Sequence, residues 1–143
     1  MFNLSQAGLN LIKRFEGCTL VAYLCPANVW TIGYGHTGSD VCEGREITMS
    51  KAEELLRQDA KKFVDGVHKL ITVVINQNQF DALVSFAFNL GLSALKGATL
   101  LKYVNEKKFN AAALEFVKWN KANGHVLNGL TLRRQAEAKL FIK

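Results

Sequence analysis

Proline and cysteine are scarce in this chain of 143 residues, which contains one Pro and three Cys. The odd number of cysteines, Cys18, Cys25 and Cys42, argues against the fully paired framework of a small secreted protein. Their spacing also lacks the CxxC pairs that are typical of zinc sites. We therefore expect three reduced thiols, no metal site and no cofactor.

The sequence also lacks a stretch that is long and apolar enough to span a membrane. Residues 17–39 contain no Lys, Arg, Asp or Glu, but Pro26, Asn28 and four glycines interrupt them, and the uncharged residues 82–95 are too few. The N-terminus has no basic residue before Lys13 and no apolar run of signal length. We expect neither an export signal nor a membrane anchor.

The composition is that of a folded, helix-rich chain with a basic surface. Apolar residues make up 49% of the chain, and its length suits one domain, residues 1–143, that buries roughly 68–70% of its unfolded surface. The net charge of +6 favours anionic partners, but no nucleic-acid motif is present, so we expect no nucleic acid. The basic residues 116–143 leave open a weak contact with an anionic membrane or lipopolysaccharide. Amphipathic core helices with solvated basic faces explain them better.

The hydrophobic pattern predicts an α+β fold with a small N-terminal sheet lobe, a larger helical lobe and a cleft between them. A first helix is expected over residues 5–16, with Ser5 as its N-cap and Gly17 as its stop. Short strands follow, so that the sheet lobe spans about residues 17–47. Later helices are predicted from a capping box at 50–53, from a second capping box at 76–79 to Gly91, and over about 99–106, 109–122 and 131–142.

Only two acidic residues, Glu16 and Asp40, precede Glu43. Glu16 falls in the last turn of the first expected helix, where the helix dipole disfavours an anion by a few tenths of a kcal/mol up to about 1 kcal/mol. The apolar neighbours Ile12 and Phe15 would add desolvation, and both effects favour the protonated carboxyl that a general acid needs. The alternative is an exposed glutamate that merely tolerates a helix end.

The stretch RFEGCTLVAYLCPANVWTIGYGHTG, residues 14–38, resembles the signature of the phage-type lysozymes, the endolysins of the T4 and lambdoid kind in glycoside hydrolase family 24. In that family a catalytic Glu is followed after eight residues by an Asp or a Cys, and after five more by a Thr. Those places are held here by Glu16, Cys25 and Thr31. The likeness continues through residues 76–91 and 130–141, and it implies a lysozyme-like fold.

The resemblance implies a muramidase that hydrolyses the β-1,4 bond between N-acetylmuramic acid and N-acetylglucosamine in peptidoglycan, with Glu16 as the proton donor. An ordinary thiol has a pKa of about 8.5, and a nearby anion would raise it further, so we expect Cys25 to be mostly neutral. We therefore expect Thr31 to hold the attacking water molecule, with Cys25 helping to place it. A thiolate nucleophile is the second choice, because no cation other than a protonated His36 lies within residues 17–39.

Three further residues are expected to support the site. By resemblance, Arg133 or Arg134 pairs with the catalytic glutamate, and the spacing to Phe141 favours Arg133. Asn89 falls where the family binds sugar. The resemblance also implies that His36 makes a structural hydrogen bond across the lobe junction, and a structural role is the commoner one for a lone histidine.

Two other functions remain open at this stage. A lytic transglycosylase needs one acid and no water, and it leaves an anhydro sugar end. A catalytically inactive wall-binding protein would keep the fold without the chemistry. If the chain is an endolysin, we expect a monomer that waits in the host cytoplasm and acts in the periplasm after a holin opens the inner membrane.

Overall fold

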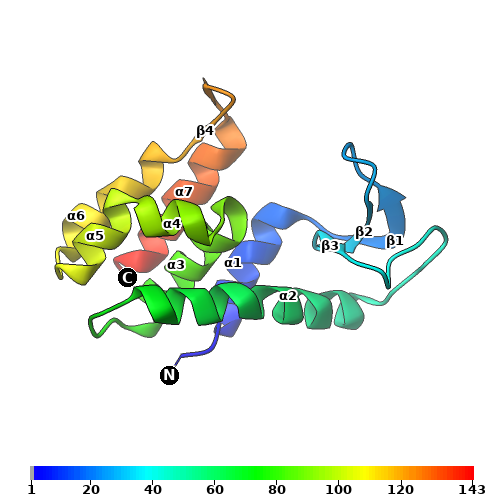
Figure 1. Ribbon diagram of the computed structural model, residues 1–143, viewed down its shortest axis with the longest axis horizontal. Helices are drawn as coiled ribbons and strands as arrows, with labels where there is room; N and C mark the ends of the chain where they lie inside the picture. The colour runs from blue at the N-terminus through cyan, green and yellow to red at the C-terminus, as the bar shows by residue number, and fades with distance from the viewer. Residues whose placement is uncertain (1) are drawn as a thin grey trace.

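The computed structural model describes residues 2–143, and it contains a small sheet lobe and a larger helical lobe (Figure 1). Helix α1 (Gln6–Glu16) leads from the helical lobe into the sheet lobe, while the long helix α2 (Met49–Leu70) runs back beneath both. The predicted α+β fold, with a small sheet lobe and a larger helical lobe, is confirmed. No helix in the described part of the chain is long and apolar enough to cross a membrane.

The sheet lobe is built from three short antiparallel strands in the order β1 (Thr19–Leu24), β2 (Trp30–Gly33) and β3 (His36–Thr37). An isolated bridge between Val21 and Glu46 closes its outer loop against β1. The lobe has a small apolar core of its own, which consists of Ile32, Val41 and, from α2, Leu55. The sheet is therefore attached to α2 by packing as well as by chain connection.

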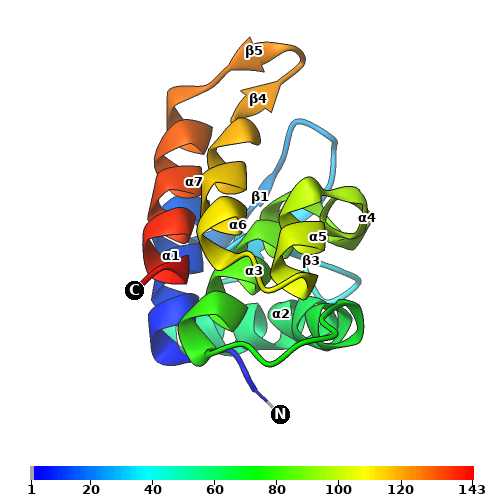
Figure 2. The same ribbon diagram turned by 90° about the vertical axis from the view of Figure 1, so that its left-hand side faces the viewer.

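In the helical lobe, α3 (Gln77–Leu90) lies in the middle and the other helices surround it (Figure 2). Around it lie α4 (Leu92–Gly97), α5 (Thr99–Asn105), α6 (Phe109–Glu115) and α7 (Asn128–Phe141). Nine consecutive residues of α3, 79–87, are buried, as its almost uniformly apolar sequence predicts. The predicted capping box is present, since Asn76 and Gln79 each bond the other's backbone N–H.

Three predicted helix boundaries are wrong, and the first error has a local cause. Helix α2 begins at Met49 rather than after Ser50, because the Thr48 hydroxyl accepts a hydrogen bond from the Lys51 N–H at 3.1 Å. The helix predicted over 109–122 stops earlier, with a short 3-10 turn η1 (Phe116–Lys118) after α6. A hairpin of β4 (Lys121–Ala122) and β5 (His125–Val126) follows, and α7 then begins at Asn128, three residues before the predicted start.

The start of α1 is fixed to α3 by a buried carboxylate. Asp81 of α3 accepts the Ser5 backbone N–H at 3.1 Å and the Ser5 hydroxyl, while that hydroxyl caps Gly8 at 3.2 Å. At Gly8 an added Cβ would lie only 2.7 Å from Asp81 Cγ, so only glycine lets the two helices approach this closely. These contacts join the first turn of α1, at the end opposite Glu16, to α3.

Candidate active site

Glu16 is the last residue of α1, at the point where the chain turns into the sheet lobe. Gly17 makes that turn with φ +70°, a left-handed conformation that favours glycine. Its N–H closes the helix on Lys13 O at 3.3 Å. The Glu16 side chain is 23% exposed, so its carboxyl is reachable from solvent while most of it is covered.

Arg133 is the arginine that reaches Glu16, and Arg134 points elsewhere. Arg133 Nη1 donates to Glu16 Oε2 at 2.9 Å, although the two residues are 117 positions apart in the sequence. Its side chain is only 3% exposed, so the contact is much less screened than a surface ion pair. The Arg133 guanidinium also lies over the Phe15 ring at 5.9 Å from the centroid.

A second carboxylate, Glu137, lies behind this contact and is fully buried. It forms an ion pair between Oε1 and Arg134 Nε at 2.8 Å, and its Oε2 accepts a hydrogen bond from the Ser85 hydroxyl at 2.5 Å. Burial raises the pKa of the Glu137 carboxyl and lowers that of Arg134, while their mutual attraction opposes both shifts. A protonated Glu137 would leave two buried guanidiniums with Glu16 alone, so the arrangement favours the ionised form near neutral pH.

Asn89 lies at the end of α3 and accepts a hydrogen bond on Oδ1 from Arg134 Nη2 at 2.9 Å. With its oxygen held in this way, the amide presents its Nδ2 donors away from Arg134. Asn89 and Glu16 both line a hollow of about 340 Å³, whose other walls are Phe15, Leu127, Gly129, Leu130 and Arg133. Apolar walls with a few fixed polar groups are typical of a ligand site.

A second hollow, of about 320 Å³, also has Glu16 in its wall and lies between the lobes. The sheet lobe contributes Tyr34, Gly35 and Thr37 to it, and the helical lobe contributes Asp59, Phe63 and Phe88. Glu16 therefore belongs to the walls of two neighbouring hollows. This is where the sequence predicted a cleft.

Cys25 and Thr31 form a separate pair on the sheet lobe. The Thr31 side chain lowers the pKa of the Cys25 thiol, and the Thr31 hydroxyl donates to Val29 O at 3.0 Å. Thr31 is buried and Cys25 half-buried. Among residues 2–143, the walls of the two hollows that contain Glu16 include neither of them. The structure thus brings Glu16, Asn89 and Arg133 together, and Cys25 with Thr31.

The thiol of Cys25 differs from the sequence-based expectation. Backbone N–H groups of Val29 and Ala27 lower the pKa of Cys25, and the Thr31 hydroxyl adds to this, while desolvation opposes it. The expected ordinary or raised pKa is therefore wrong in direction. No cation is involved: the turn after Cys25, with Asn28 at φ 62°, supplies the hydrogen bonds.

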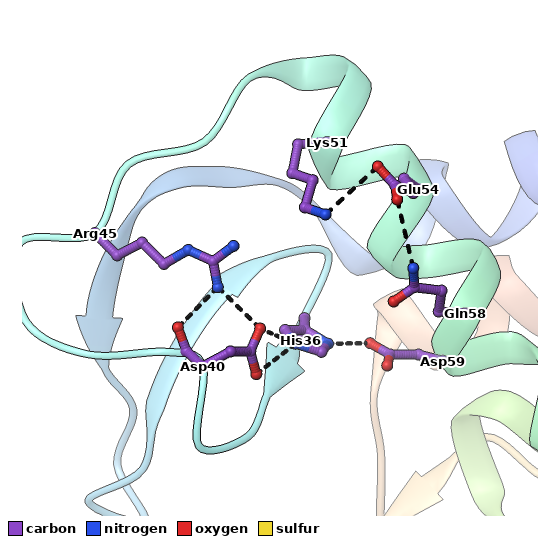
Figure 3. Close-up of polar contacts among 7 residues, drawn as sticks. All are labelled: His36, Asp40, Arg45, Lys51, Glu54, Gln58 and Asp59. Carbon is purple, nitrogen blue, oxygen red and sulfur yellow. Dashed lines mark hydrogen bonds and ion pairs between the residues drawn. The ribbon is translucent and has the colours of Figure 1, made fainter.

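His36 links the sheet lobe to α2 (Figure 3). Its Nδ1 lies 2.8 Å from Asp59 Oδ2, and its Nε2 lies 3.0 Å from Asp40 Oδ2. Burial alone would lower the pKa of His36, but the hydrogen bonds to Asp59 and Asp40 outweigh it and the pKa is raised. Arg45 holds Asp40 in turn, with Nη1 2.8 Å from Oδ2. His36 is thus placed as a connection between the lobes and is absent from the walls of both hollows among the described residues.

The arrangement can support acid catalysis on a neutral ligand. A carboxyl held by one buried guanidinium, at the junction of two hollows, can give a proton to a bound oxygen atom. Within residues 2–143, no group of three or more His, Cys, Asp or Glu side chains is suited to hold a metal ion.

Sequence reasoning missed three residues of this region, namely Ser85, Glu137 and Asp59. A signal for Glu137 existed, because Arg133 and Arg134 precede it by four and three positions, the spacing at which helical side chains meet. Ser85 lies in an apolar helix and Asp59 in an amphipathic one. Neither has a comparable local signal.

Comparison with known proteins gives a consistent family. Residues 13–137 match the family model described as phage lysozyme. The endolysin of Bacillus phage B103 is 56% identical over 98% of this chain, and that of Salmonella phage P22 is 42% identical over 99% of both chains. The crystal structure of a P22 lysozyme mutant superposes with a TM-score of 0.94 at 40% identity, covering 100% of both chains.

The relatives differ in length. This chain covers 99% of the P22 endolysin but only 54% of the endolysins of Bacillus phages B103 and PZA. It thus spans about half the length of those two Bacillus phage proteins.

Proposed function

Since the chain belongs to the phage lysozyme family, we propose that it is a muramidase of the endolysin type, acting as a single lysozyme-like domain. Its substrate is bacterial peptidoglycan, in which it hydrolyses the β-1,4 bond between N-acetylmuramic acid and N-acetylglucosamine. The observation that carries this proposal is the position of Glu16, in the wall of two hollows and held by a buried arginine. A glycan strand that occupied both hollows would pass this carboxyl.

In the proposed reaction, Glu16 gives its proton to the bridging oxygen as the bond from that oxygen to the muramic acid carbon breaks. Arg133 keeps the carboxyl in place, and Asn89 donates hydrogen bonds from its amide to the sugar. A water molecule held at Thr31 attacks the same carbon and loses its proton to the Cys25 thiolate or to solvent. The lowered pKa of Cys25 supports this role, because it increases the fraction of thiolate that can accept the proton.

The products of digestion test this function directly. We expect purified peptidoglycan to yield fragments with new reducing muramic acid ends, with the anomeric configuration inverted in proton NMR of the first products. Retention of the anomeric configuration would indicate that the Cys25 thiolate, rather than water, attacks the sugar. Fragments with anhydro sugar ends in the mass spectrum would indicate a transglycosylase reaction instead of hydrolysis. Binding to cell walls without release of sugar fragments would indicate an inactive binding protein.

Substitutions of Cys25 measure its share of the reaction. We expect Cys25→Asp to be at least as active as the wild type, because a carboxylate is ionised at neutral pH and accepts the proton of water. Cys25→Ala should lose about 100-fold in kcat, the lower end of what a positioned base contributes, with Cys25→Ser in between. The rate of release of reducing ends is the measurement. Equal activity in all three variants would show that Cys25 has no chemical role.

We further propose that the protein works as a monomer on the wall of a bacterial host. The net charge of +6 supports association with the anionic envelope, including weak contact with anionic lipid or lipopolysaccharide. Its action at the wall requires no nucleic acid.

A further inference from the structure

Glu137 is the point at which the two arginines of α7 meet. Its Oε2 lies 3.4 Å from Arg133 Nε and 3.2 Å from Arg134 Nη2, and its Oε1 lies 2.8 Å from Arg134 Nε. Ser85 of α3 completes the contacts with its hydroxyl at 2.5 Å. All of these side chains are buried, so each contact has a single geometry that water does not screen.

From Glu137, two chains of hydrogen bonds lead to the same hollow. Arg133 continues to Glu16 at 2.9 Å, and Arg134 continues to Asn89 at 2.9 Å. Both end residues line the hollow of about 340 Å³, where the proposed reaction places the sugar. One buried carboxylate therefore holds the side chains that fix the acid and the amide.

The charges of this group also balance. Two buried guanidiniums, Arg133 and Arg134, face two carboxylates, Glu137 and Glu16. Among the described residues, the other titratable groups in the walls of the two hollows are Tyr34 and Asp59, and Asp59 is already bonded to His36. Without the charge of Glu137, both arginines would depend on Glu16.

We propose that Glu137 is a positioning residue of the site, which holds Arg133 against Glu16 and Arg134 against Asn89. This inference rests on the muramidase function proposed above. Fold stability alone does not explain a carboxylate here, because a buried ion pair is often no more stabilising than apolar side chains of similar size. The ion pairs of Glu137 instead orient Arg133 and Arg134, which contact Glu16 and Asn89.

The test is Glu137→Gln, which keeps the shape of the side chain and removes its charge. We expect kcat/KM on purified peptidoglycan to fall about 10- to 100-fold, as displaced reacting groups do. KM should rise because Asn89 loses its support, and kcat should fall because Arg133 no longer holds Glu16 in a fixed position. Glu137→Asp, which keeps the charge, should recover part of the lost kcat/KM.

Asp81→Asn is the matched control. Asp81 is also a fully buried carboxylate that accepts a serine hydroxyl, but it belongs to α3, contacts the start of α1 and is absent from the walls of both hollows. Well below the melting temperature, we expect a lower Tm for Asp81→Asn with unchanged kcat, KM and pH profile. That contrast separates a positioning role from a general loss of stability.

The inference is overturned if Glu137→Gln melts lower than the wild type but keeps its kcat and KM while Glu16→Gln is inactive. If Glu137→Gln does not fold, Ser85→Ala decides, since it removes only the hydroxyl that donates to Glu137 and accepts from Arg133 Nη2 at 3.5 Å. A fall of about fivefold in kcat/KM supports the positioning role, and wild-type kinetics overturn it. A wild-type protein that releases no reducing ends contradicts the proposed function itself, which is a distinguishable result.

Discussion

Glu16→Gln should abolish the release of reducing ends from peptidoglycan, with a loss of at least about 1000-fold in kcat. A positioned general acid contributes typically 10²–10⁴-fold, and the amide has no proton of suitable acidity to give. The amide oxygen can still accept the hydrogen bond that Arg133 Nη1 now gives to Glu16 at 2.9 Å. The side chain therefore keeps its place, and the loss reports on the proton.

The control for this variant is Glu54→Gln, because Glu54 is an exposed glutamate on α2 that pairs only with Lys51 and Gln58 in the described structure. It should keep wild-type activity and stability. We expect Glu16→Gln itself to fold, with a Tm close to the wild type, since removing an anion from a helix C-terminus offsets part of the lost ion pair. A turnover rate of Glu16→Gln above a tenth of the wild-type rate would show that Glu16 is not the general acid.

Arg134→Met should have the largest effect on stability. It removes the 2.8 Å ion pair and the 3.2 Å hydrogen bond to a carboxylate that is fully buried. Breaking such a pair costs about 3 kcal/mol, because the remaining charge keeps its desolvation penalty. For a chain of this length we expect Tm to fall by roughly 10 °C, measured by thermal or urea unfolding.

The matched control is the double variant Arg134→Met with Glu137→Met, which removes both charges and fills the volume with apolar side chains. We expect it to recover at least about half of the lost free energy of unfolding, since apolar replacement of a buried pair is often neutral. If Arg134→Met is as stable as the wild type, the contacts of Arg133 and Ser85 suffice to compensate the buried charge of Glu137.

The parts of the fold that the sequence predicted well are those with a strong local signal. Ser5 and Gly17 mark the ends of α1, and Asn76 and Gly91 mark those of α3, because caps and stops act within one turn. The start of α2 was misplaced because Thr48 and Ser50 are both good caps, two residues apart. The sequence Asn123, Gly124 is a hairpin signal, which the helices predicted over 109–122 and 131–142 leave unused.

The site depends on contacts that no local pattern contains. Arg134 and Glu137 are charged residues of types that are almost never fully buried unless paired, and only the packing of α7 against α3 buries them. The lowered pKa of Cys25 likewise depends on the backbone course of the following turn. The sequence could thus nominate Glu16, but it could not reveal what holds Glu16 in place.

Glu16 lies in the shared wall of two hollows rather than at the closed end of one. A long polymer can therefore lie across the carboxyl with sugar units continuing on either side, and it needs no free terminus to be cut. Scission in mid-strand divides a cross-linked net into large pieces. A bacterial envelope under turgor would then fail after few cuts, long before its sugars are digested to small products.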